Sequence, residues 1–254
     1  MTALFLVTSP GYTATKWLAW SLNGHPGVYC NHSAGSDVLH RDYTREELAA
    51  LAADKHERRD ETPVDDFFAR LLERAGGAAA AGNVHRYNPT ALNRNLARFG
   101  RPRPFRAVNL LRHPVPWVES GAQQLGRMYG AAPVVRRRLE AHFRRNRGLY
   151  RALGAPTFPW PSELAFCYLC GRLERLAAEL SDGSVRHVRM EDVTSDPDAL
   201  RKLIGSLTGL DPDAAAVRCA LESVPIHRHR RAAPDAAAQL EAWSTWQRAV
   251  FGYW

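Results

Sequence analysis

The first residues that could do chemistry follow a short apolar run at positions 3–8. A Pro10-Gly11 turn comes next, small and hydroxylated residues follow, and a helix is predicted from about residue 17. The first N–H groups of a helix have no partner within it and carry partial positive charge, so such a start favours phosphate or sulfate. Thr13, Thr15 and the Lys16 ammonium can add donors. The predicted anion loop comprises Ser9, Pro10, Gly11, Tyr12, Thr13, Ala14, Thr15, Lys16 and Trp17.

This loop differs from the nucleoside-triphosphatase loop, in which Gly precedes Lys and a hydroxyl residue follows to bind magnesium. Here Thr15 precedes the basic residue, and Trp17 occupies the magnesium-binding position. The pattern therefore argues against ATP with magnesium. A phosphotransferase that uses ATP is kept as the less favoured alternative.

A second anion site is predicted where the apolar run at 107–111 ends. Arg112 follows that run, a proline-containing turn comes next, and Ser120 lies eight residues beyond Arg112 on the following predicted helix. An arginine at a strand end offers two parallel hydrogen bonds to a phosphate, and a serine hydroxyl can add a third. The alternative is an ordinary strand-end arginine with a serine on a helix surface.

Two histidines could accept a proton near neutral pH. His85 is the last residue of the predicted third strand at 83–85, and His32 follows the second strand at 28–31. Ligands of α/β proteins gather at the carboxyl ends of parallel strands, which favours both positions. Each is therefore a candidate for the general base, and His32 could alternatively contact the acceptor. A structural histidine satisfied by local partners is the competing interpretation for each.

The segment from Tyr12 to Val28 resembles the 5'-phosphosulfate loop and helix of the sulfotransferase family. The segment from Arg112 to Ser120 resembles that family's 3'-phosphate motif. Residues 83–89 and 187–197 resemble two further family segments, and the likeness spans about residues 3 to 210. It implies a P-loop nucleoside-triphosphatase-like sulfotransferase fold, with 3'-phosphoadenosine 5'-phosphosulfate as co-substrate and no metal. It also implies His85 as the base, in-line displacement, and a small-molecule or carbohydrate acceptor bearing a hydroxyl or amine.

The chain departs from the family loop at two positions. Tyr12 stands where the family has a basic residue, and Ala14 stands in place of the loop glycine. Lys16, one helical turn later, is the hypothetical replacement for the missing charge. A weakened member that binds a nucleotide without turnover is therefore the principal alternative.

Elements that could position these residues alternate along the chain, with short β-type runs between longer helical patterns. Strands separated by helices predict a parallel sheet covered on both faces, hence a three-layer α/β fold. The whole chain, 1–254, is expected to form a single domain. The run Gly76 to Gly82 is predicted to be a loop, 36–62 a charged surface helix with a connection, and 162–181 a helix carrying Cys167 and Cys170 on a buried face rather than at a redox or zinc site.

Composition adds a preference for an anionic partner. Lys and Arg number 34 against 26 Asp and Glu, a formal net charge of +8. Arg228 and Arg230 lie in a basic segment that resembles the family's donor-closing segment, although a solvated charge run explains it equally well.

The aromatic C-terminal tail predicts packing against the body or a second subunit, so a homodimer is one alternative. No nucleic-acid partner is expected. The N-terminal apolar run is too short for a signal peptide or membrane span, and a cytoplasmic location is expected.

Overall fold

The computed structural model describes residues 1–32, 62–100, 103–152, 160–169, 172 and 185–223. The first half of the chain forms β1 (Ala3–Thr8), α1 (Thr15–Asn23), β2 (Val28–His32), α3 (Val64–Ala75), β3 (Ala80–Val84), α4 (Pro89–Phe99) and β4 (Arg106–Leu111). The second half forms α5 (Pro114–Ala131), α6 (Pro133–Ala152), β5 (Arg186–Arg189), α8 (Met190–Ser195), α9 (Pro197–Thr208) and α10 (Ala214–Glu222). These elements group into two compact units, and their borders fall near Arg112 and Gly183.

The first unit contains a five-stranded parallel sheet with the order β2-β3-β1-β4-β5. Strand β1 lies at its centre, and Phe5, Leu6 and Val7 are at most 2% exposed because both sheet faces are covered. Continuous apolar runs are typical of such central parallel strands. The predicted α/β class and three-layer arrangement are confirmed.

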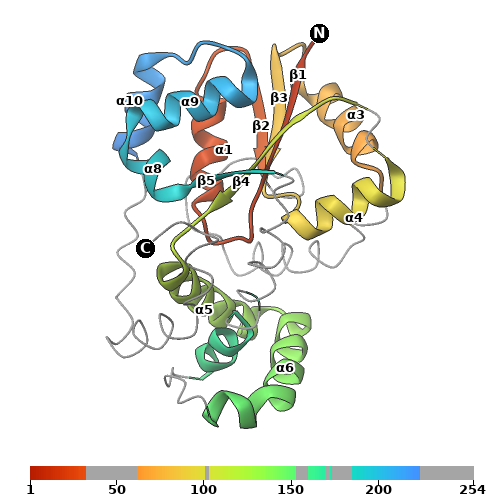
Figure 1. The fold of residues 1–254 in the computed structure, drawn as a ribbon, viewed down its shortest axis with the longest axis vertical. Helices are drawn as coiled ribbons and strands as arrows, with labels where there is room; N and C mark the ends of the chain where they lie inside the picture. The colour runs from red at the N-terminus through yellow and green to blue at the C-terminus, as the bar shows by residue number, and fades with distance from the viewer. Residues whose placement is uncertain (33–61, 101–102, 153–159, 170–171, 173–184, 224–254) are drawn as a thin grey trace. The chain divides into compact units, whose positions relative to one another are not determined.

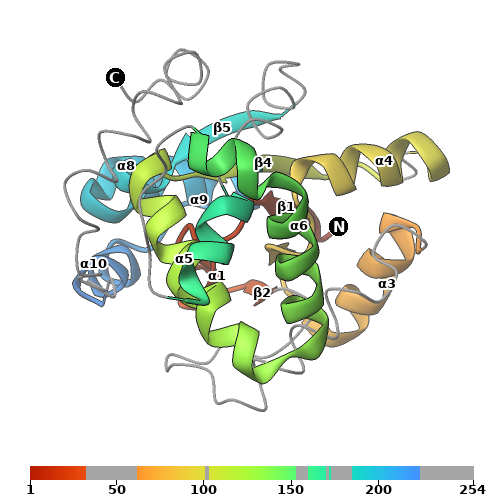
Figure 2. The same cartoon turned by 90° about the horizontal axis from the view of Figure 1, so that it is seen from below.

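Side chains of β1 alternate between two separate cores. Phe5 and Val7 pack in a cluster that contains residues of α1, α8, α9 and α10. Leu4 and Leu6 pack in a second cluster with residues of α3 and α4. The two groups of helices lie on opposite faces of the sheet in both views (Figures 1 and 2). The period of two along a strand thus produces the three layers.

The predicted loop from Gly76 to Gly82 is wrong in its second part, because β3 begins at Ala80. The strand prediction failed since Ala and Gly have low strand propensity. Small residues are required here: Gly82 pairs with Phe5 across the sheet, and a Cβ on Gly82 would lie 2.3 Å from the Phe5 ring. Packing therefore overrides propensity at this position.

The second unit contains α5 and α6. On α6, Val135, Leu139 and Phe143 recur at helical spacing and are buried. The Trp160 ring lies edge-on to the rings of Tyr129 and Phe143, with centroid distances of 6.0 Å to each. The Tyr129 hydroxyl donates to Glu140 Oε1 at 2.6 Å, which joins α5 to α6.

Several predictions fall wholly or partly outside the described residues. The predicted surface helix at 36–62 lies outside them except for residue 62, and Cys170, Arg228, Arg230 and the aromatic tail lie outside them entirely. The described part of the predicted 162–181 helix is helical over 162–169, and there Cys167 is buried. Burial raises the pKa of the Cys167 thiol to about 11, which keeps it as an unreactive thiol.

Candidate anion-binding site at the carboxyl edge of the sheet

The strand order places a switch in chain direction between β1 and β4. The chain leaves β1 toward β2 on one side of the sheet, and it leaves β4 toward β5 on the other side. Loops that depart in opposite directions from adjacent parallel strands leave room for a ligand at their carboxyl ends. The loop after β1 and Arg112 after β4, both singled out in the sequence, lie at this point.

The loop between β1 and α1 has an unusual backbone. Gly11 has φ 90°, Tyr12 has φ 59° and Ala14 has φ 51°. Tyr12, Ala14 and His85 are the non-glycine residues with positive φ in the described part of the chain. Left-handed backbone costs an L-residue about 1–2 kcal/mol. All three strained residues are therefore gathered at one edge of the sheet, where strain often accompanies function.

Internal hydrogen bonds hold this loop in shape. The hydroxyls of Ser9 and Thr13 lie 2.5 Å apart, and the Gly11 N–H donates to Ser9 Oγ at 2.9 Å. Ser9 and Thr13 are fully buried. Because these hydroxyls are committed to the loop, their main effect is to fix the direction of its backbone amides.

The start of α1 continues from the loop without a side-chain cap. Ala14 occupies the N-cap position in left-handed conformation, and its methyl group cannot accept a hydrogen bond. Capping side chains normally satisfy the first amides of a helix. Their absence at this N-cap favours an external anion there. Lys16 lies partly exposed on the first turn, and no acidic residue lies in that turn.

Arg112 contacts the loop directly. Its Nη1 donates to the Tyr12 carbonyl oxygen at 3.1 Å. The guanidinium therefore brings positive charge to the uncharged residue Tyr12. The sequence predicted Arg112 as a phosphate ligand but gave no signal for this second contact.

His85 lies beside the same loop. It follows β3 with φ 75°, and its backbone N–H donates to the Val7 carbonyl oxygen at 2.8 Å. A Cβ on Gly11 would lie 3.3 Å from His85 Cε1, so the imidazole packs against the loop backbone. The His32 and His85 rings are stacked, with centroids 5.8 Å apart and planes inclined by 26°. The structure thus brings both predicted histidines to one place.

A row of buried polar side chains, not anticipated from the sequence, supports this edge. Asn83 Nδ2 donates to Asn31 Oδ1, and Asn83 Oδ1 accepts from the backbone N–H of Arg86 at 2.7 Å. On the other side of the row, Thr8 Oγ1 donates to Asn109 Oδ1 at 3.0 Å. The Asn31–Asn83 and Thr8–Asn109 pairs join residues in register on neighbouring strands. Satisfied buried networks of this kind make a site rigid.

The side chains of Trp17 and Ser120, two predicted ligands, are both buried. The Trp17 side chain is 3% exposed, packs in the core, and donates from Nε1 to the Ala220 carbonyl at 2.9 Å. Its side chain therefore serves packing, and only its backbone is available to a ligand. Ser120 is buried on α5 in the second unit.

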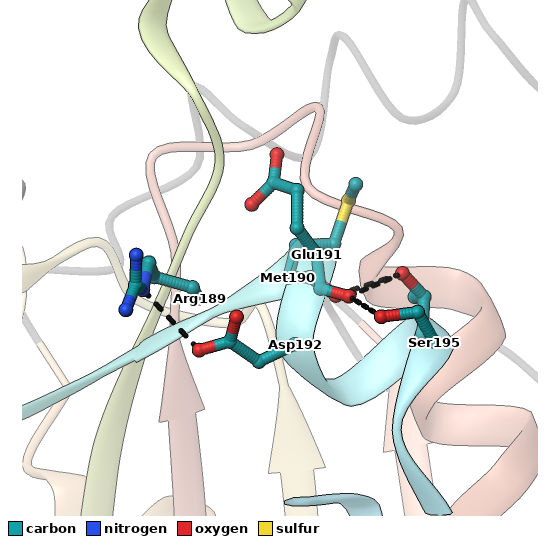
Figure 3. Close-up of polar contacts among 6 residues, drawn as sticks. Arg189, Met190, Glu191, Asp192 and Ser195 are labelled. Carbon is teal, nitrogen blue, oxygen red and sulfur yellow. Dashed lines mark hydrogen bonds and ion pairs between the residues drawn. The ribbon is translucent and has the colours of Figure 1, made fainter. Parts of the chain in front are cut away.

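The segment at 187–197, for which no chemical role was predicted, is shown in Figure 3. Arg189 Nε lies 3.2 Å from Asp192 Oδ2, and Ser195 Oγ donates to the Glu191 carbonyl at 2.7 Å. Both charged side chains are about half exposed, so their ion pair contributes at most about 1 kcal/mol. These contacts form the turn from β5 into α8.

Comparison with known proteins adds one finding. No protein-family model and no curated protein matches the sequence. The structure is similar to the crystal structure of a sulfotransferase from Alicyclobacillus acidocaldarius, with a TM-score of 0.52 and 17% sequence identity. The match covers 99% of this chain and 94% of that chain. The chain has a sulfotransferase fold.

The sulfotransferase fold confirms the resemblance that the spaced motifs predicted, although sequence identity is low. Within the described residues, no helix is long and apolar enough to cross a membrane. The same residues contain no group of three or more His, Cys, Asp or Glu side chains placed to hold a metal ion.

Proposed function

We propose that this protein transfers a sulfonate group from 3'-phosphoadenosine 5'-phosphosulfate to a hydroxyl or amine of a small molecule or carbohydrate. The observation that carries the proposal is the strained loop after β1, which Arg112 contacts and against which His85 packs. The loop, an uncapped helix start and a histidine therefore meet at the switch point of a sulfotransferase fold.

The loop amides and the start of α1 would hold the 5'-phosphosulfate. Arg112 would bind the 3'-phosphate while it keeps its contact with the Tyr12 carbonyl, and Ser120 would add a hydroxyl. Arg228 and Arg230 are proposed to bind the same phosphate. Fixed donors aimed at an anion need no reorganisation during the reaction, which lowers the barrier.

His85 would take the proton from the acceptor as its oxygen or nitrogen attacks sulfur. The bond between sulfur and the bridging oxygen breaks on the opposite side, and 3'-phosphoadenosine 5'-phosphate leaves with the electron pair. Lys16 would stabilise the negative charge that develops on the leaving group. A positioned general base contributes about 10² to 10⁴ in rate.

A second candidate is a nucleotide-binding protein with little or no turnover. The observation in its favour is the loop itself, because Tyr12 has no charge and both Tyr12 and Ala14 have a backbone that suits glycine.

Residues 1–254 are proposed to act as one sulfotransferase domain in either case, since the structural match covers nearly the whole chain.

The two candidates are separated by a transfer assay with labelled donor and a panel of phenols, alcohols, amines and sugars. The key variant is His85→Asn, since Asn tolerates the left-handed backbone of position 85. Transfer should fall by about 10² or more in this variant, while affinity for 3'-phosphoadenosine 5'-phosphate stays close to that of the unaltered protein. Nucleotide binding without transfer to any acceptor would favour the second candidate.

A further inference from the structure

One hydrogen bond at the candidate site is not accounted for by the sulfonate-transfer scheme. Thr15 Oγ1 and His32 Nε2 lie 3.1 Å apart. Thr15 is the first residue of α1 and His32 is the last residue of β2, and both are 7% exposed. Thr15 is buried at the start of an uncapped helix, so an anion bound there would lie beside its side chain. The direction of the Thr15 hydroxyl proton therefore decides whether that hydroxyl attracts or repels the anion.

We propose that His32 is a positioning residue, whose Nε2–H donates to Thr15 Oγ1 so that the Thr15 hydroxyl proton is directed to the bound anion. The proposal rests on the proposed function, because the anion is the 5'-phosphate of the nucleotide or the sulfonate of the donor.

The chemistry of a hydroxyl group favours His32, and not Thr15, as the hydrogen-bond donor of this pair. Thr15 has one proton and two lone pairs, and His32 can meet it either as donor or as acceptor. If His32 Nε2 accepted, the Thr15 proton would be used internally and its lone pairs would face the anion. Oxygen lone pairs repel an anionic oxygen. If His32 donates, the Thr15 proton becomes available for a charge-assisted hydrogen bond to the anion.

The arrangement gives the two histidines different tasks. His32 has Nε2 engaged with Thr15. His85 is more exposed, packs against Gly11 and is the proposed base toward the acceptor. The two rings are stacked with their centroids 5.8 Å apart, so the two histidines are neighbours. The proposal therefore keeps His85 as the base.

The test is a double-variant cycle on the full chain, with 3'-phosphoadenosine 5'-phosphate as the titrated ligand. Thr15→Val and His32→Ala should each weaken binding about fivefold to tenfold, and the double variant should lose no more than about tenfold. Thr15→Ser should recover most of the affinity lost in Thr15→Val. Ser206→Ala removes a hydroxyl that bonds to its own helix at the Leu203 carbonyl, and it should leave affinity unchanged.

A second measurement does not depend on variants. The ring nitrogens of His32 can be observed by nitrogen-15 NMR in the nucleotide complex, and Nε2 should carry a proton. Losses that multiply in the double variant, or an Nε2 without a proton, would overturn the role of His32 while nucleotide binding still stands. Failure of the unaltered protein to bind the nucleotide would instead overturn the proposed function, and this inference with it.

Discussion

The guanidinium of Arg112 is hydrogen-bonded to the carbonyl of Tyr12, with 3.1 Å between Nη1 and the oxygen. This contact joins the end of β4 to the loop after β1, two segments that are 100 residues apart in the chain. A change at Arg112 therefore affects both the charge at the site and the shape of the loop. The effect of loop shape can be separated from the effect of charge by a substitution in the loop that removes no charge.

Gly11→Ala changes the loop without removing a charge. Gly11 has φ 90°, and a Cβ there would also lie 3.3 Å from His85 Cε1. The expected result is a loss of about 1–2 kcal/mol in the free energy of unfolding, from the left-handed backbone, together with weaker binding of 3'-phosphoadenosine 5'-phosphate. Urea unfolding and calorimetric titration measure the two quantities.

Gly77→Ala is the matched control for this change. Its φ is 84°, but a Cβ there would meet nothing within 4 Å. The backbone cost should therefore be similar while nucleotide affinity stays unchanged. Equal affinities for both variants would contradict the contact between the loop and His85.

Gly82→Ala tests the register of β3 on β1. The new Cβ would lie 2.3 Å from the ring of Phe5, which is fully buried and cannot move aside. Overpacking of this kind should cost about 3 kcal/mol of unfolding free energy. The double variant Phe5→Leu with Gly82→Ala should be less destabilised than the sum of the single changes. Simple additivity would show that the two residues are not in contact.

His25 should make stability depend on pH. It is 5% exposed, neither ring nitrogen has a hydrogen-bond partner within the described residues, and burial lowers its pKa although the Asp213 carboxylate acts to raise it. The unfolded chain therefore takes up a proton near pH 6.5 before the folded chain does. The free energy of unfolding should consequently fall as pH drops below that value.

Urea unfolding at about pH 8 and about pH 5.5 measures this dependence, and His25→Gln provides the comparison because it cannot take up the proton. The variant should lose less stability on acidification than the unaltered protein. Identical losses in the two proteins would show that His25 is not the group responsible.

The sequence was sufficient for the fold class and for the positions of the loop, Arg112 and both histidines. Each of these is a local signal, either an apolar run that ends at a polar residue or a short spaced motif. The start of β3 was missed because Ala80 and Gly82 have low strand propensity. Their small size is required by residues on the neighbouring strand β1. Local propensity cannot register such a partner.

The contacts within the site could not be predicted from the sequence. The bond between Thr15 and His32 depends on how α1 packs on β2, and the pair Asn31 and Asn83 depends on strand register. The positive φ values of Tyr12 and Ala14 run against their residue types. Tertiary structure imposes these features, and they concentrate at the site that is proposed to bind the nucleotide.

The most direct test of the account is calorimetric titration with 3'-phosphoadenosine 5'-phosphate, comparing the unaltered protein with Arg112→Ala and using ATP with magnesium as the control ligand. Binding is expected to require the 3'-phosphate and to weaken by about tenfold or more in the variant, and ATP with magnesium is not expected to reproduce it. No binding by the unaltered protein, or equal binding by the variant, would contradict it.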